Sequence, residues 1–358
     1  MTAPMPLLDL DDGDALVGAD VDGMLRSAAT GGAQIRATHS AVQEGALDRL
    51  QGLRPRSVVL VTGSGRAGRA ASLVTALLAP HLGFPVVHVS HTPRWVGSLD
   101  VVVVAGDDAG DPRLADAVDG AVRRGAEVVV AAPDEGPLRG ASAGRAMVLA
   151  PRIPAAPQHG LLRFCAVYLA VVATLEAKPN TAMPNLSDLA DAVDAEALRD
   201  SPVNEVFHNP AKSLAAQMHG RRIVLVGDTE SAVELACAGA EALLYSGRVA
   251  AAAELADALR AGAALASTVV ESPHADPIFH DPDLDGPVAD EPVRFFALAP
   301  QESRHVTERR LVGLSDGVLV VADPDEVDGA ASSRFEEAAV LATRLDMAAA
   351  YLRLTGGR

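Results

Sequence analysis

The sequence feature that most constrains the fold is an apolar run followed at once by closely spaced glycines. Residues 57–61 read Ser-Val-Val-Leu-Val, then come Gly63, Gly65 and Gly68, and an alanine-rich segment follows. This order predicts a strand, a tight loop and a helix. Backbone N–H groups and the positive end of the helix converge in such a loop, so that an anion can bind there.

The same glycines satisfy the G-x-G-x-x-G spacing of dinucleotide-binding folds, which is a weak signal by itself. A site for NAD also needs an acidic residue at the end of the second strand. That strand is predicted over 84–89, and Ser90 and His91 follow it in place of an acid. The sequence therefore favours an anion site or a simple tight turn over a dinucleotide site, and no cofactor is expected.

Composition and charge exclude several classes of protein. The chain has 358 residues, enough for two ordinary domains, and a formal net charge of -17, which repels nucleic acid and anionic membranes. The only cysteines, Cys165 and Cys237, lie in apolar helical patterns and are expected to be buried free thiols. No signal peptide is visible, and the longest apolar segment, 161–173, contains Arg163 and is too short to span a bilayer. We expect a soluble, cytoplasmic protein.

The first half of the chain alternates strands with helices. Strands are predicted over 57–61, 84–89, 99–105, 127–132 and 147–149. Helices are predicted over 33–50, 67–78, 112–124 and 161–175. The unbroken apolar run 101–104 is typical of a central parallel strand, and Pro112 suits the first turn of a helix. This pattern predicts a doubly wound α/β layer.

The second half repeats this organisation after a break. Proline-rich segments flank an acidic amphipathic helix over 186–198, which predicts a linker. Further strands are predicted over 222–226, 266–270, 293–298 and 317–321, and further helices over 211–218, 249–259, 302–311 and 333–354, with one more ending near 245. We predict two domains, 1–178 and 209–358, joined by the linker 179–208. Each is a parallel sheet flanked by helices, which a weak internal duplication explains.

Five stretches carry a further signal through their shared order along the chain. They are Asp22–Leu25, Phe84–Val86 with Thr92–Val96, Arg124–Val129, Asn209–Ala215 and Leu345–Leu352. Together they resemble the bifunctional phosphoglucose/phosphomannose isomerase family, whose chains carry two sugar-isomerase (SIS) domains. The resemblance covers nearly the whole chain. It implies two SIS-like domains that face each other across a cleft, and a homodimer in which the second subunit completes the site.

The resemblance also implies a chemistry, the aldose–ketose isomerisation of hexose 6-phosphates. In the family a carboxylate moves a proton between C1 and C2, a histidine helps to open the ring, and loop hydroxyls hold the phosphate. Proton transfer requires a positioned base with a pKa near the working pH. A dianionic phosphate requires several donors and no adjacent carboxylate.

This sequence departs from the family at most of those positions. The hydroxyl residue of the first loop is replaced by Ala67, and the donors of the loop after the third strand are replaced by Asp107, Ala109 and Pro112. The catalytic glutamate falls near 245–248, where no acid occurs, and the C-terminal lysine segment has no counterpart. Three loop carboxylates would repel a phosphate unless they were protonated or bound to a metal.

The candidate site residues follow from the motifs and from this resemblance. For the phosphate they are Gly63, Ser64, Gly65, Arg66, Asp107 and Gly110, and for ring opening they are His274 and His280. The acids Asp107, Asp108 and Asp111 have two interpretations, a divalent-metal site or carboxylates that favour a helix N-terminus, and the second is favoured. The two histidines lie in a Pro/Asp-rich stretch, for which a solvated loop is the competing interpretation. Other acids weighed as a base are Glu241, Glu254 and Glu271.

Two functions therefore stay open at this point. The first is an isomerase that interconverts glucose or mannose 6-phosphate and fructose 6-phosphate on rebuilt residues. The second is a sugar-phosphate sensor or partner subunit without catalysis, and the loss of the glutamate, the loop hydroxyls and the lysine segment together favours this second function. In both, the predicted partner is a sugar phosphate or another carbohydrate derivative, with neither nucleic acid nor membrane.

Overall fold

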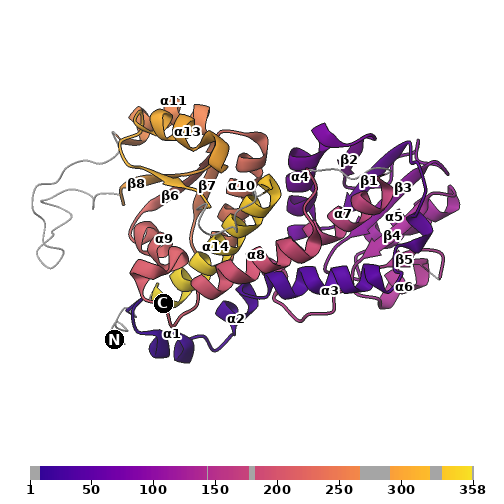
Figure 1. Ribbon diagram of the computed structural model, residues 1–358, viewed down its shortest axis with the longest axis horizontal. Coiled ribbons are helices and arrows are strands. Elements are labelled where there is room, and N and C mark those ends of the chain that lie inside the picture. Colours follow the sequence, from indigo (N-terminus) through magenta and orange to yellow (C-terminus); the bar gives the residue numbers. More distant parts are fainter. Residues whose placement is uncertain (1–8, 143, 177–181, 267–290, 323–332, 357–358) are drawn as a thin grey trace, which may run out of the picture.

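Two parallel sheets, each covered by helices, make up the protein (Figure 1). The computed structural model describes residues 9–142, 144–176, 182–266, 291–322 and 333–356. The α/β class, with two doubly wound layers, is confirmed.

The first sheet has five strands in the order β2-β1-β3-β4-β5. They are β1 (Ser57–Thr62), β2 (Val86–Val89), β3 (Asp100–Ala105), β4 (Glu127–Ala131) and β5 (Met147–Val148). Every residue of β3 is buried, as the unbroken apolar run predicts for a central strand. Val58 and Leu60 belong to the core on the side of α4 and α7, while Val59 and Val61 pack on the side of α5 and α6. These helices are α4 (Arg66–Leu78), α5 (Pro112–Arg123), α6 (Gly136–Ser142) and α7 (Leu161–Leu175).

The second sheet has the order β7-β6-β8-β9 and repeats the topology of the first. Its strands are β6 (Arg222–Gly227), β7 (Ala250–Glu254), β8 (Val293–Leu298) and β9 (Gly317–Val320). The helices around it are α9 (Pro210–Met218), α10 (Glu230–Tyr245), α11 (Leu255–Ala266), α13 (Arg304–Leu311) and α14 (Arg334–Thr355). Ser333 begins α14 with a capping box that includes Glu336, and almost the whole length of α14 is buried.

In the second half of the chain, two predicted elements differ from the structure. The helix predicted over 249–259 is wrong in its first part, because 250–254 form β7 and α11 begins only at Leu255. The alanines of β7 favour a helix in isolation, but parallel pairing with β6 satisfies their backbone groups and overrides that propensity. The strand predicted over 266–270 begins at the last residue of α11, and its remainder lies outside the described residues.

Helices, rather than strands, connect the two halves. The long helix α3 (Gly31–Gln43) ends before Gly45, whose φ of 93° stops the helix predicted to run on to residue 50. The acidic helix α8 (Leu186–Arg199) packs against both α3 and α14 and so spans the two halves (Figure 1). The short helices α1 (Gly13–Ala19) and α2 (Met24–Ala28) pack against α14. The division into 1–178, 179–208 and 209–358 stays a prediction. None of the described helices combines the length and apolar character needed to cross a membrane.

Gly227 provides a test of the second layer. A Cβ atom built there lies 2.3 Å from backbone atoms of Ala232 and Val233, because α10 sits directly on the end of β6. We expect Gly227→Ala to lower the free energy of unfolding in urea by about 3 kcal/mol. The control Gly140→Ala, in the exposed face of α6 with open space around it, should be neutral or stabilising by about 0.5–1 kcal/mol. Equal stabilities for the two variants would contradict this packing.

Candidate functional site

The carboxyl ends of β1 and β3 form the topological switch point of the first sheet. In the order β2-β1-β3-β4-β5 the connections from these two neighbours leave toward opposite faces, to α4 and to α5, and ligands of open α/β sheets bind at such a point. The predicted loops 63–65 and 107–110 meet here. Gly63 N donates to Ala105 O at 2.9 Å, and a Cβ atom on Gly65 would lie 3.6 Å from Asp107 Oδ2. We call the space over these two loops the β1–β3 crevice, after the position that ligands take at such a switch point.

Gly65 gives the crevice its loop geometry. Its φ of 92° and ψ of -152° lie in a region that only glycine adopts without strain, and they turn the chain directly into α4. No side chain caps that helix end, so its first backbone N–H groups are not taken up by a capping oxygen. The N-terminus of α4 therefore keeps uncapped backbone N–H donors, as the sequence predicts for an anion site.

Asp107 faces this loop from the end of β3. Its carboxylate forms an ion pair of 3.0 Å with Arg163 Nη2, which comes from α7. Burial raises the pKa of the Asp107 carboxyl, and the Arg163 guanidinium opposes that shift. Burial also lowers the pKa of Arg163. The partly buried carboxylate of Asp107 thus lies beside the backbone N–H donors at the start of α4.

The other acids of the loop after β3 serve the local backbone. Asp108 Oδ1 accepts from the N–H of Gly110 at 2.7 Å. Asp111 is the N-cap of α5, where it accepts from Arg113 N at 2.9 Å and pairs with the Arg113 guanidinium. This geometry is that of helix-cap and turn carboxylates. Across the described ranges, no group of three or more His, Cys, Asp or Glu side chains could hold a metal ion.

Arg66 is directed away from the β1–β3 crevice. Its side chain is only 2% exposed and lies between the two halves of the molecule. The guanidinium donates to Gln158 O at 2.8 Å, to Ala238 O at 2.8 Å and to the carboxylates of Glu241 and Asp346 at 3.2 and 3.0 Å. Burial raises the pKa of Asp346, and Arg66 opposes the shift. Glu241, weighed from sequence as a base, is an ion-pair partner of both Arg66 and Arg69.

The imidazole of His88 lies beside the carboxyl end of β1, and the sequence analysis did not identify it as a site residue. His88 is in β2, with Nε2 2.9 Å from Thr62 Oγ1 at the end of β1 and Nδ1 3.4 Å from Ser72 Oγ. His88 is exposed at its surface, but desolvation on its inner side lowers the pKa of the imidazole, which favours the neutral ring at pH 7. The sequence signal that could have identified His88 is its position as a polar residue near the end of an otherwise apolar strand. The predicted His274 and His280, and Glu271, lie outside the described residues.

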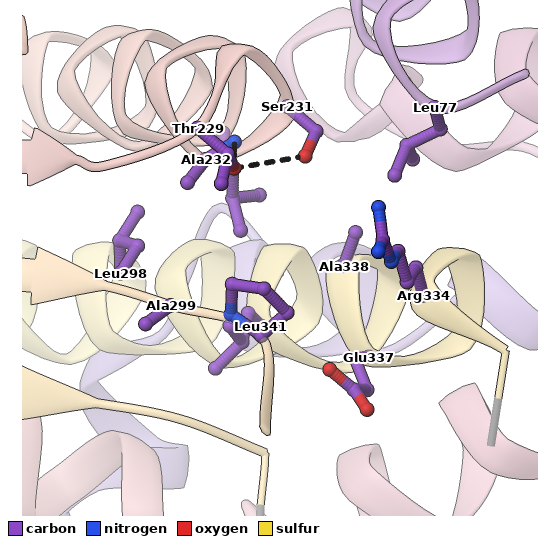
Figure 2. A pocket seen from close by; sticks show the side chains of 12 residues that line it. Leu77, Thr229, Ser231, Ala232, Leu298, Ala299, Arg334, Glu337, Ala338 and Leu341 are labelled. Carbon is purple, nitrogen blue, oxygen red and sulfur yellow. Dashed lines mark hydrogen bonds between the residues drawn. The ribbon is translucent and has the colours of Figure 1, made fainter. Parts of the chain in front are cut away.

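The second sheet has its own hollow at the corresponding place, between the ends of β6 and β8. This hollow is small and open to solvent, and Leu77 of α4 also lines it. Figure 2 shows the hydroxyls of Thr229 and Ser231 side by side, 3.2 Å apart, with Arg334 and Glu337 projecting from α14. Thr229 caps α10, and Arg334 pairs with Glu302 at 2.5 Å. The remaining walls are mostly apolar.

Comparisons with known proteins identify the fold. No protein-family model and no curated protein sequence matches the chain. The C-terminal domain of glucosamine-fructose-6-phosphate aminotransferase from Francisella tularensis matches with a TM-score of 0.58 and 9% identity, covering 95% of this chain and 96% of that one. A glucose-6-phosphate isomerase like protein from Thermus thermophilus matches with 0.52 and 17%, over 97% and 93%. A candidate phosphosugar isomerase from Bacillus subtilis matches with 0.58 and 16%, over 90% and 94%. The similarity shows the fold alone, and it agrees with the predicted α/β class of two parallel sheets flanked by helices.

The buried network around Arg66 makes a testable prediction. Replacing Arg66 by Met keeps the apolar stem but leaves the buried Asp346 carboxylate without its cation. We expect a loss of about 3–5 kcal/mol in the free energy of unfolding, measured in urea. The control Arg113→Met, at an exposed arginine that pairs with Asp111, should cost far less. Similar losses in the two variants would show that Arg66 does not join the halves as described.

Proposed function

We propose that the protein binds a phosphorylated sugar in the β1–β3 crevice and does not isomerise it. The support is the convergence of the glycine loop, the uncapped start of α4 and the loop after β3 at one switch point of the sheet. Proteins of the same fold are named for phosphosugars, which favours this ligand class. On this proposal the chain is a divergent relative of the phosphoglucose/phosphomannose isomerases, as its motif order suggests.

The ion pair between Asp107 and Arg163 is the main support for a site that binds the sugar phosphate without isomerising it. An isomerase needs a free carboxylate over the reacting carbons and hydroxyl donors around the phosphate. Here Asp107 is held by Arg163, Asp108 by the backbone of Gly110 and Asp111 by Arg113. These carboxylates are committed to local partners, and they weaken the affinity for a dianion. Such a site is suited to sensing an abundant sugar phosphate rather than to turnover.

Removing the Asp107 charge should therefore strengthen phosphate binding. We expect Asp107→Ser to bind fructose 6-phosphate about tenfold more tightly than the wild type, a gain of about 1.4 kcal/mol, because the repulsion is removed and Arg163 is released to donate to the phosphate. Titration calorimetry measures both affinities, with unphosphorylated fructose as the ligand control. The control Asp119→Ser, on the outer face of α5, should leave affinity unchanged. Equal or weaker binding by Asp107→Ser would contradict the proposed phosphate position.

A second candidate function is isomerisation with His88 as the proton carrier. The specific observation is the neutral imidazole beside Thr62, at the carboxyl end of the strand that leads into the glycine loop. The roles sought from His274 and His280 stay predictions, as do the homodimer, the cytoplasmic location and the absence of a cofactor.

A coupled assay separates the two functions. Offered fructose 6-phosphate, the purified wild type should form neither glucose 6-phosphate nor mannose 6-phosphate above the uncatalysed rate, while calorimetry still detects binding. Turnover that falls at least a hundredfold in His88→Gln, with binding retained, would replace the first proposal with the second. His91→Gln is the matched control, because His91 is exposed and its ring forms a hydrogen bond with the neighbouring Ser90 rather than with the end of β1.

A further inference from the structure

A groove of about 410 Å³ lies outside both sheets, between α1, α2 and the end of α8. It is lined by the segments 17–29 and 197–202 and by Met347 of α14, and most of the lining side chains are apolar. Leu25 of α2 and Met347 are its most buried lining residues, at 4% and 1% exposed. The volume falls in the range of sites for small organic ligands. We call it the α1–α8 groove.

Large apolar side chains are exposed on and beside the α1–α8 groove. Val17 and Val21 line it and are 58% and 90% exposed. Leu198 and Val203, each directly after a lining residue in the sequence, are exposed as well. Water contact with so much apolar surface in one place is unfavourable, and such a surface commonly marks a binding site.

Contacts from three elements hold the walls of the groove in place. At the start of α1, Gly13 packs closely on Pro202, because a Cβ atom there would lie 2.6 Å from Pro202 O. From α9, Lys212 Nζ donates to the same carbonyl at 2.8 Å. From α14, Arg353 pairs with Asp22 at 2.5 Å and fixes the turn between α1 and α2. The groove is therefore formed in the absence of a ligand, which lowers the entropic cost of binding one.

The groove has two charged lining side chains, and one of them is available to a ligand. The Asp20 carboxylate is engaged by the backbone, since its two oxygens accept from Met24 N and Leu25 N at 2.7 and 2.9 Å. Arg26 is exposed, and within the described part of the chain it forms neither a hydrogen bond nor an ion pair. The available group is thus a guanidinium beside apolar walls, and its charge and shape are complementary to a carboxylate.

We propose that the α1–α8 groove binds an amphipathic monocarboxylate, a molecule with one carboxylate on an unbranched apolar body. The carboxylate pairs with Arg26, and the apolar body lies against Leu25, Met347 and Val21. Burial of the body provides most of the affinity, while the solvent-exposed ion pair selects the charge of the head group. The groove shares no residue with the loops of the β1–β3 crevice, so its test is independent of the proposed sugar-phosphate site.

Titration calorimetry of the full chain with octanoate tests this proposal. We expect saturable binding of one octanoate, and binding of hexanoate that is about tenfold weaker because two fewer methylene groups are buried. Octylammonium, which has the same chain length and the opposite charge, should bind more weakly than octanoate. Equal affinities for hexanoate and octanoate would overturn the proposal. So would tighter binding of octylammonium, which would identify Asp20 as the group that recognises the ligand.

Variants on the groove walls locate the octanoate. Arg26→Gln should weaken its binding about fivefold, while Arg54→Gln, at an exposed arginine outside the groove, should not change it. Ala197→Leu fills the groove from α8 and should weaken binding by about tenfold. Ala195→Leu, on the exposed side of the same helix, should bind octanoate as the wild type does. Wild-type affinity in Arg26→Gln or in Ala197→Leu would overturn the proposal.

A second copy of the chain is the competing occupant of this apolar surface. Sedimentation velocity of the wild type and of Val21→Ser separates the two occupants. We expect the same sedimentation coefficient for both proteins, together with octanoate binding that is about threefold weaker in Val21→Ser. A wild-type dimer that Val21→Ser dissociates would show that the groove is covered by a second copy, and would overturn the proposal.

Discussion

The guanidinium of Arg66 holds the two halves of the molecule together, and the geometry of the candidate site depends on it. Arg66 is the first residue of α4, directly after the turn at Gly65, and its partners come from the segment before α7, from α10 and from α14. A buried cation of this kind is tolerated only when its donors are matched by carbonyls and carboxylates. Because the loop 63–65 ends at this anchored side chain, the contact between the halves fixes the start of α4.

The charges around the crevice explain why the fold suits a phosphate ligand while the side chains do not match those of an isomerase. The topology places backbone donors at the switch point, as in other folds that bind phosphates. The side chains nearby add carboxylates instead of hydroxyls, and each of them has a local partner. An enzyme gains from groups that are free to follow the reaction, whereas a binding protein requires only that the ligand outcompete these internal pairs. On the proposed function, this balance favours reversible recognition over catalysis.

Much of the fold could be predicted from sequence, because long apolar runs and helix signals act locally. The run 101–104 predicted the buried centre of β3, and Pro112 predicted the start of α5. Partners far apart in the chain could not be predicted. Arg66 was interpreted as an anion ligand, yet its carboxylate partners lie 175 and 280 residues away, on helices whose approach only the tertiary structure defines. His88 was missed for the same reason, and β7 was mistaken for a helix because its pairing with β6 is not visible in its alanines.

The most direct test of the central claim is a crystal structure of the full chain with fructose 6-phosphate. The account predicts unreacted sugar phosphate, with its phosphate against the backbone of Gly63 to Gly65 at the start of α4 and the Asp107 carboxylate turned toward Arg163. A phosphate bound elsewhere, for example in the hollow beside Thr229 and Ser231, or a crevice that stays empty at saturating ligand, would contradict it.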